Sequence, residues 1–329
     1  MKKHRFDALP TLTRAERVAE LHGIDSLFLP SDVLQSTVLP TIAWCALALC
    51  VVFSATFFVV DAFLPLGAAT ALSKRRKVCY QLTNFCANTA LGLAGWYTEV
   101  YLQPADLSYT NIPPEHSVQG FDHLLFFSCF QLGYQLWAIP TGGILVGESP
   151  AMLAHHFAVI LVAGMSAFLT NGFRYWTPFF YGFIELSSIP LAIMNTFKDN
   201  PAWIQKHGAA YLAVRLIFCF MFLWIRLVMF LPRQYVFLRD HFLLFTSSDN
   251  RPYQVFMALV FVSALILQIL QIYWGFLILK GLGRVVQGFL SGGGSRKKKE
   301  SSPATMNGDV GKDNGAAHSL NGTQAKKES

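Results

Sequence analysis

The chain has 329 residues, of which 53% are hydrophobic and only 14% are charged, and its mean hydropathy is +0.40. Soluble domains carry about 25% charged residues, so this composition excludes an ordinary soluble globular protein and indicates one built within a membrane. The net charge of +7 is concentrated at the two ends and in one short loop. In a membrane protein such a pattern is a topology signal rather than a sign of nucleic-acid binding.

Residues 1–37 form a polar N-terminal segment. Within it, Thr13-Arg14-Ala15-Glu16 has capping-box spacing, so we expect Thr13 to cap a short helix that ends at Gly23. The first apolar run starts only near Val38, and we therefore expect no cleavable signal peptide.

Seven apolar stretches follow, each long enough to cross roughly 30 Å of bilayer hydrocarbon as a helix. Strand-like alternation is absent, which leaves helices as the spanning form. The predicted fold class is an all-α membrane protein of about seven transmembrane helices, with an extra helix at 38–62 ahead of a six-helix bundle. The stretches cover 38–60, 78–102, 120–140, 151–170, 178–197, 209–231 and 253–279.

The orientation follows from the basic residues, which favour the cytosolic side. Placing Lys74-Arg75-Arg76-Lys77 in the cytosol puts the N-terminus in the lumen, together with a 103–119 loop that has no Lys or Arg. The tail from Lys280 onward is then cytosolic. Against this orientation stand five Lys and Arg in the N-terminal segment and three Arg in the predicted 232–252 loop.

Residues 286–329 are predicted to be a disordered, basic cytosolic tail. It finishes with Lys326-Lys327-Glu328-Ser329, which matches a dilysine retrieval signal. The match agrees with the orientation above and implies residence in the endoplasmic reticulum membrane, with the coat machinery as a partner of Lys326 and Lys327.

Polar side chains recur at helical spacing inside the apolar stretches, where such groups tend to face a bundle interior or a wet cavity. They predict a polar cavity that is either water-filled or binds the headgroups of membrane lipids. The alternative is structural: Asn and Gln pairs bond helices together at about 0.6 kcal/mol each, and Arg226 pairs with Glu185 in a salt bridge. The candidates are Asn84, Asn88, Gln131, Gln135, His155, His156, Glu185, Ser188, Asn195, Arg215, Arg226, Gln268 and Gln271.

His155 and His156 are the candidate catalytic pair. They lie about 100° apart on one helix, so they cannot both face lipid cheaply, and imidazole titrates near neutral pH. A general base or nucleophile in acyl transfer is the predicted chemistry. Pairing of either histidine with Glu185 would need shifted helix boundaries or a kink at Pro190, because Glu185 is roughly 18 Å from the cytosolic end of its span.

The six cysteines have no metal-ligand or CxxC spacing, so we expect no disulfide, no metal site and no bound cofactor. An internal repeat and a charged pore ring are also lacking, which makes a transporter or channel the weakest of the functional classes.

Four motifs in this order resemble the TLC-domain membrane proteins, a group that includes the ceramide synthases. The resemblance covers roughly residues 70–280, and a TLC domain is expected over 70–285. It implies a lipid-handling role in the endoplasmic reticulum. The motifs are Ser73-Lys74-Arg75-Arg76-Lys77, Leu132-Gly133-Tyr134, His155-His156 and Phe183-Ile184-Glu185-Leu186-Ser187-Ser188.

Two departures separate this chain from the ceramide synthases. Those enzymes follow the His-His pair with a span carrying paired aspartates, whereas here the next acidic residue is the single Glu185. Many relatives have an Asp after the third-span motif, where this chain has Gln135 and Leu136. The chain therefore resembles the smaller, non-ceramide-synthase branch.

Two hypotheses remain open. In the first, the protein is an acyltransferase that uses acyl-CoA and a sphingoid base or lysolipid. His155 or His156 would activate the acceptor, Glu185 would orient the imidazole or bind the amine, and Ser188, Asn195 and Arg226, with Gln135, Asn84 and Asn88, would shape the substrate site. In the second, the protein is a non-catalytic lipid-binding or cargo-escort protein. The missing aspartates favour the second hypothesis and the paired histidines favour the first.

Overall fold

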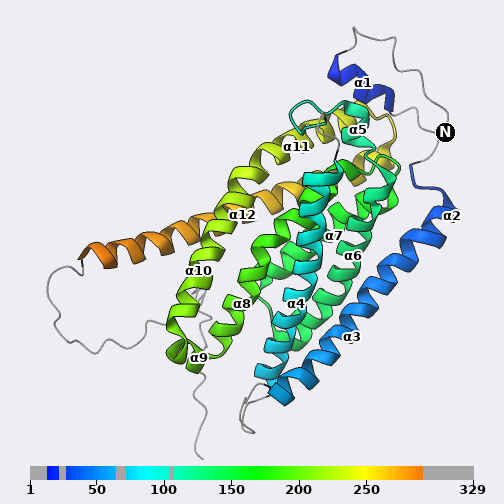
Figure 1. Cartoon of the computed structure of the whole chain (residues 1–329). Helices are drawn as coiled ribbons and strands as arrows, with labels where there is room; N and C mark the ends of the chain where they lie inside the picture. The colour runs from blue at the N-terminus through cyan, green and yellow to red at the C-terminus, as the bar shows by residue number, and fades with distance from the viewer. Residues whose placement is uncertain (1–12, 22–26, 64–71, 104–106, 292–329) are drawn as a thin grey trace, which may run out of the picture. The chain divides into compact units, whose positions relative to one another are not determined.

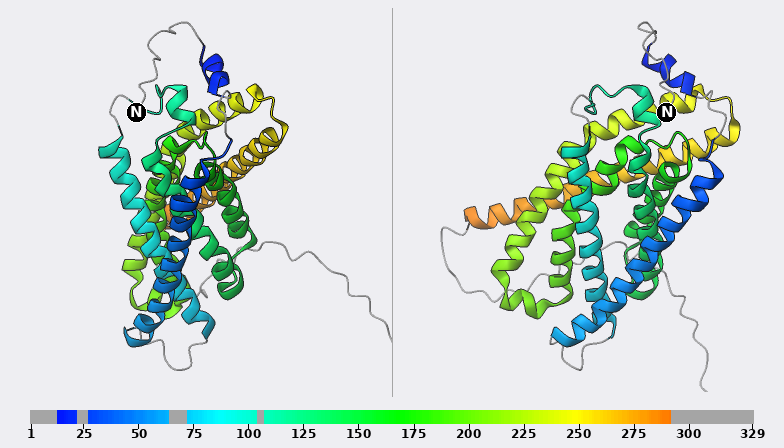
Figure 2. Two further views of the ribbon diagram at one scale, coloured as in Figure 1. Left: turned by 90° about the vertical axis from the view of Figure 1, so that its right-hand side faces the viewer. Right: turned by 45° about the vertical axis from the view of Figure 1, so that its right-hand side comes forward.

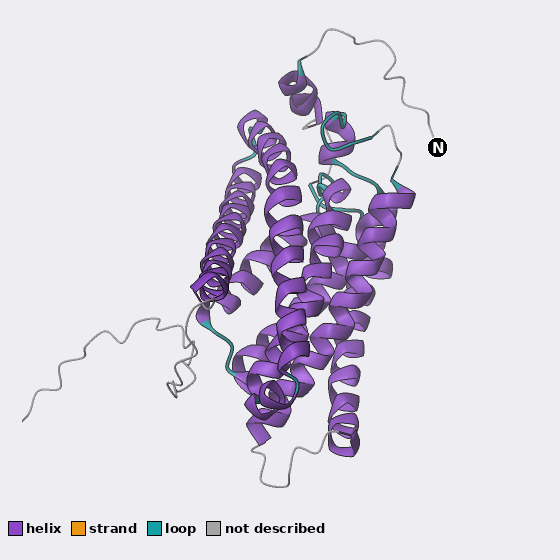
Figure 3. Cartoon of the chain, turned by 60° about the vertical axis from the view of Figure 1, so that its left-hand side comes forward, coloured by secondary structure: helices purple, strands orange, loops and turns teal. Residues whose placement is uncertain are grey.

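The structure is a computed structural model that describes residues 13–21, 27–63, 72–103 and 107–291. The chain divides into two compact units, Met1–Gly281 and Leu282–Ser329. Every site discussed below lies in the first unit. The described residues are almost wholly helical (Figure 3), and their only extended pairing is one isolated bridge between Phe28 and Leu169.

The N-terminal helix α1 (Arg14–Glu20) confirms the predicted capping box. The Thr13 side chain accepts from the Glu16 backbone N–H, and the Glu16 carboxylate accepts from the Thr13 backbone N–H. The guanidinium of Arg14 donates to both oxygens of Asp240, at 2.9 and 2.6 Å. This ion pair fixes α1 on α11 (Phe230–Ser247).

Long helices stand side by side in the centre of the first unit (Figures 1 and 2). Their packing order is α7 against α6, α6 against α3, α3 against α4, α4 against α8, and α8 against α10. The portion of α12 in this unit crosses them obliquely (Figure 1). The bounds are α3 Leu39–Phe63, α4 Leu72–Tyr97, α6 Leu125–Pro140, α7 Pro150–Phe168, α8 Ser188–Asp199, α10 Gly208–Leu223 and α12 Arg251–Ser291.

Short helical segments interrupt or extend these rods, and those labelled η have 3₁₀ or π pitch. π-helical turns are rare and often occur at functional sites, because they rotate the side chains that follow. The predicted 178–197 span is the most affected, since it is built from η7, η8 and α8 in succession. The short segments are α2 Ser31–Val33, η2 Leu34–Val38, η3 Thr98–Leu102, α5 Pro114–Val118, η4 Asp122–Leu124, η5 Thr141–Val146, η6 Arg174–Trp176, η7 Pro178–Gly182, η8 Phe183–Ser187, α9 Pro201–Lys206 and η9 Trp224–Met229.

The predicted loop at 232–252 is wrong over most of its length. Helix runs without a break from Gly208 to Ser247, through α10, η9 and α11. The charged and polar residues that suggested a loop have partners within the protein: Asp240 binds Arg14 and Arg239, and His241 bonds the Met257 carbonyl. Residues 286–291 of the predicted tail likewise belong to α12, whereas Lys326 and Lys327 lie outside the described residues.

Apolar side chains cover much of the outer surface of the long helices. Phe58 on α3, Phe220 on α10 and Phe276 on α12 are 78%, 68% and 61% exposed. Exposed apolar surface of this extent needs a non-aqueous environment. In the described part of the chain, four helical stretches are long and apolar enough to cross a membrane: Ser31–Val60, Pro150–Phe168, Gly208–Ser247 and Arg251–Arg284.

Candidate functional site

His156 is held on both sides of its ring. Its Nε2 lies 3.1 Å from Oε2 of Glu148, and its Nδ1 lies 2.6 Å from Oε1 of Gln135 on α6. Carboxylate oxygens only accept hydrogen bonds, so the proton on Nε2 points to Glu148. If His156 is neutral, its Nδ1 accepts a hydrogen bond from the Gln135 side-chain NH₂, with the amide oxygen and nitrogen of Gln135 exchanged. If His156 is charged, it donates a hydrogen bond to Gln135 and another to Glu148. Either way, His156 is a positioned ring with no free nitrogen.

Glu148 lies in the short connection between η5 and α7. Gly147 has φ 73°, a left-handed conformation that ends η5 and that glycine adopts without strain. The Glu148 backbone N–H donates to the Gly142 carbonyl at 2.9 Å, and Ser149 caps α7 by accepting from the Met152 N–H. A Cβ added at Gly142 would lie 2.6 Å from Oε2 of Glu148, so glycine at this position leaves room for the carboxylate.

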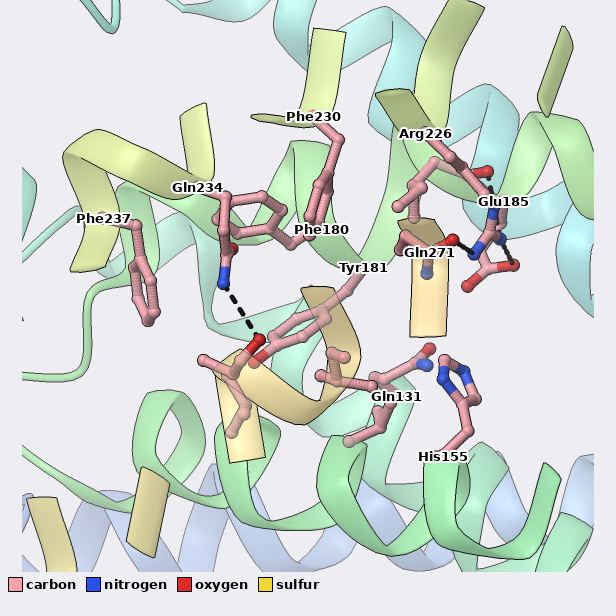
Figure 4. A pocket seen from close by; sticks show the side chains of 15 residues that line it. Gln131, His155, Phe180, Tyr181, Glu185, Arg226, Phe230, Gln234, Phe237 and Gln271 are labelled. Carbon is pink, nitrogen blue, oxygen red and sulfur yellow. Dashed lines mark hydrogen bonds and ion pairs between the residues drawn. The ribbon is translucent and has the colours of Figure 1, made fainter. Parts of the chain in front are cut away.

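His155 faces the other way, into a cavity of about 50 Å³ (Figure 4). Its Nδ1 is buried without a hydrogen-bond partner among the described residues. The ring is held by edge contacts with His156 and with Trp274 of α12, at centroid distances of 5.8 and 5.6 Å. Gln131 lines the same cavity, and its Oε1 is also buried without a described partner. His155 is therefore the member of the pair with a free nitrogen.

Arg226 of η9 and Glu185 of η8 line another part of the cavity (Figure 4). The salt bridge suggested by the sequence is present, with Nη2 of Arg226 3.5 Å from Oε2 of Glu185. Ser188 joins the two: its hydroxyl donates to Glu185 at 2.6 Å and accepts from Nη2 of Arg226 at 2.8 Å. Arg226 also donates to Ser187 at 2.7 Å and to Gln271 at 3.4 Å.

The structure corrects the expected pairing of Glu185 with a histidine. Glu185 was expected to orient an imidazole or bind an amine, but the carboxylate that meets a histidine is Glu148. Glu185 is instead occupied by Ser188 and Arg226. Glu185 lies on η8, which packs against η9, the segment that carries Arg226.

The remaining predicted residues are divided between the site and its surroundings. Asn84 accepts from the Tyr134 hydroxyl at 2.9 Å, beside Gln135, and thereby ties α4 to α6. Asn88 is buried on the same face of α4, one turn further along. Asn195 on α8 is half-buried and does not line the cavity. The structure therefore brings together His155, Glu185 and Arg226, with Ser188 and Gln271 beside them, and leaves Asn195 apart.

Glu148 is the functional candidate that sequence reasoning missed. It lies just before the fourth apolar stretch, outside every predicted span. Its spacing of eight residues from His156 carries no helical signal, because Glu148 lies outside α7, ahead of the N-cap Ser149. Among the described residues, no group of three or more His, Cys, Asp or Glu side chains gathers in a way that could hold a metal ion.

The fold, the exposed apolar helices and the buried polar network define an integral membrane protein of the all-helical class. The family model of the TLC domain matches residues 75–280, well over half of the chain. The protein therefore belongs to the TLC-domain family. The resemblance seen in the four sequence motifs is thus confirmed. No characterised protein sequence and no solved structure matches the chain.

Proposed function

We propose that this TLC-domain protein handles lipids in the endoplasmic reticulum membrane as an acyl-CoA-dependent acyltransferase, with His155 as the general base. The observation that carries the proposal is the surroundings of His155: its Nδ1 has no hydrogen-bond partner among the described residues, and its side chain lines a cavity that Arg226 and Glu185 also line. A base needs one unengaged nitrogen within reach of the acceptor, and its neighbour His156 has none.

The reaction balances with the groups at hand and two substrates of stated class. His155 takes the proton of a lipid amine or hydroxyl as that atom attacks the carbonyl carbon of the acyl-CoA thioester. The carbon–sulfur bond breaks, and the imidazolium returns its proton to the departing thiolate. The products are an N- or O-acyl lipid and free coenzyme A, and no redox change occurs.

The other residues have supporting roles in this proposal. Glu148 and Gln135 hold His156, whose ring contacts that of His155 and fixes its direction. Arg226, with its charge balanced by Glu185, is available to the acceptor headgroup, and Ser188 links the two. A bundle of seven spans with a polar, lipid-accessible interior is part of the proposal.

A non-catalytic lipid-binding or cargo-escort role is the second candidate. The cavity volume of about 50 Å³ favours the cargo-escort form of this role, because sites that hold whole small-molecule ligands occupy about 300–1,000 Å³. Acyl transfer therefore requires α12 or η9 to move away from α7 and open the cavity, whereas an escort protein needs no such opening.

The test is a transfer assay on the purified full-length chain with radiolabelled long-chain acyl-CoA and a mixed extract of sphingoid bases and lysolipids. A labelled lipid that forms in proportion to protein supports acyl transfer and identifies the acceptor. Protein that melts cooperatively and co-purifies with intact lipid, but yields no labelled product, supports the lipid-binding role instead.

Residence in the endoplasmic reticulum and an orientation with a lumenal N-terminus and a cytosolic C-terminus belong to the same proposal. They rest on the distribution of basic residues and on Lys326 and Lys327 as ligands of the coat machinery. Replacing both lysines with serine is expected to move the protein to later compartments, as seen by microscopy. If that variant changes the lipid composition of the cell as much as a variant without His155 does, trafficking is the function.

A further inference from the structure

A second cavity, of about 290 Å³, lies between η3, η7 and α11 and shares no lining residue with the histidine cavity. It is several times larger and more polar in character, and the acyl-transfer proposal leaves it unused. The residues that give it its chemistry are Glu99, Gln103, Tyr109, Tyr175, Phe179 and Arg233.

The Arg233 guanidinium lies over two aromatic rings, and most of its N–H donors have no hydrogen-bond partner among the described residues. Its guanidinium carbon lies 4.5 Å from the Tyr109 ring centre and 4.4 Å from the Phe179 ring centre. Of its five N–H donors, one bonds the Met229 carbonyl at 3.2 Å within the same helical rod. A flat, pre-oriented guanidinium with free N–H groups is suited to bind a phosphate through two hydrogen bonds.

Glu99 supplies the opposite charge in the same cavity. Its Oε1 accepts from Gln103 at 3.1 Å, and its Oε2 lies 3.7 Å from Nη2 of Arg233, too far for a hydrogen bond. Oε2 is thus an available acceptor for an ammonium group. Because the cavity holds one fixed positive and one fixed negative charge, it favours a ligand that carries both signs over a ligand with a net charge.

The outer surface of the same segment indicates the depth of this cavity in the bilayer. Trp96, Tyr97 and Tyr101 flank Glu99 and are 40%, 50% and 62% exposed, and their rings contact one another at 5.4–5.5 Å. Exposed Trp and Tyr concentrate at the level of the lipid headgroups. A ligand that enters the cavity at this depth comes from the membrane interface.

We infer that this cavity binds the zwitterionic headgroup of a phospholipid with a primary amine, its phosphate on Arg233 and its ammonium on Glu99. The aromatic rings of Tyr109 and Tyr175 add cation–π attraction for the ammonium group. The site lies at the end of α4 away from Lys74-Arg75-Arg76-Lys77, and it goes beyond the proposed acyl transfer, which takes place at His155.

The test is native mass spectrometry of the full-length protein titrated with phosphatidylethanolamine, phosphatidylcholine and phosphatidylglycerol, and with soluble O-phosphoethanolamine. The wild type is expected to prefer phosphatidylethanolamine. Arg233→Gln should weaken its binding about tenfold or more, since it removes charge-assisted hydrogen bonds. Arg251→Gln, on an exposed arginine at the start of α12, is the matched control and should bind as the wild type does.

Glu99→Gln separates headgroup recognition from folding. It keeps the side-chain size and the bond to Gln103 but removes the negative charge, so the preference for phosphatidylethanolamine over phosphatidylglycerol should fall while total lipid binding persists. Equal binding of the three lipids by the wild type would overturn the inference, as would equal effects of Arg233→Gln and Arg251→Gln. Competition by O-phosphoethanolamine at matched concentration would assign the site to a soluble metabolite and also overturn it. None of these readings depends on transferase activity.

Discussion

Nε2 of His156 lies 3.1 Å from Oε2 of Glu148, across the turn that begins α7. With Gln135 on the opposite nitrogen, this contact makes His156 a fixed neighbour of His155 rather than a free base. Adjacent histidines thus have different roles, because one points to a polar clamp and the other to a cavity.

Replacing Glu148 with Ala should loosen this clamp. His156 would keep a buried N–H without its acceptor, which costs roughly 1–3 kcal/mol of stability. We expect a lower melting temperature in detergent and a reduced rate of the lipid reaction, with Glu148→Gln in between. Glu115→Ala removes only an outer contact with Arg17 at 3.8 Å and should change little. Equal melting temperatures for Glu148→Ala and Glu115→Ala would contradict the clamp.

The Arg226–Glu185 pair predicts a non-additive mutant cycle. Arg226→Met leaves the Glu185 carboxylate buried with Ser188 as its remaining partner, at a cost of roughly 3–5 kcal/mol. Combining it with Glu185→Met should recover most of the stability, because both charges are then gone. Arg215→Met, on the same continuous rod without a described ion pair, is the control. Strictly additive losses in thermal unfolding would show that the pair does not interact.

Gly95 of α4 is predicted to tolerate no side chain. A Cβ there would lie 2.2 Å from the Phe183 backbone nitrogen and 2.5 Å from the Gly182 carbonyl carbon. Such close approach through small residues is a common way for helices to pack in membranes. Gly95→Ala should destabilise by about 1–3 kcal/mol or more and displace η8, which carries Glu185. Gly208→Ala, where nothing lies within 4 Å, should be neutral or slightly stabilising.

Asp240 is predicted to anchor the N-terminal helix. It is completely buried and accepts hydrogen bonds from Arg14 and Arg239, and from Ser117 at 2.5 Å. Asp240→Ala would leave the Arg14 guanidinium with the Ile112 carbonyl as its remaining partner and should cost about 3–5 kcal/mol in thermal unfolding. The exposed Asp249 provides the control variant, Asp249→Ala, with an expected change below about 0.5 kcal/mol. A double mutant with Arg14→Ala should lose little more than Asp240→Ala alone.

The sequence predicts the fold class and the family, since apolar length and the four motifs are local properties. The Thr13 capping box is predicted for the same reason. Predictions fail where residues distant in the sequence determine the local structure. Helix α11 continues through Arg233 and Asp240 because Glu99 and Arg14 neutralise their charges. The altered pitch of η8 and η9, which directs Glu185 to Arg226, leaves no mark in composition or periodicity.

The candidate site is predicted in its residue types but not in its pairings. The free-energy cost of placing polar side chains inside an apolar span is enough to identify His155, Glu185 and Arg226 as candidates. Glu148 lies outside the predicted span, just ahead of the N-cap Ser149, and only its side chain reaches His156. Spacing along one helix therefore could not identify which carboxylate meets which histidine.

The most direct measurement is the rate of labelled-lipid formation by purified His155→Asn beside His156→Asn, with melting temperatures measured on the same samples. Loss of a general base lowers rates by about 10²–10⁴-fold. The account predicts that His155→Asn loses activity to this extent at an unchanged melting temperature, and that His156→Asn loses both activity and stability. Full activity of folded His155→Asn, or no product from the folded wild type with any acceptor, would contradict catalysis by His155.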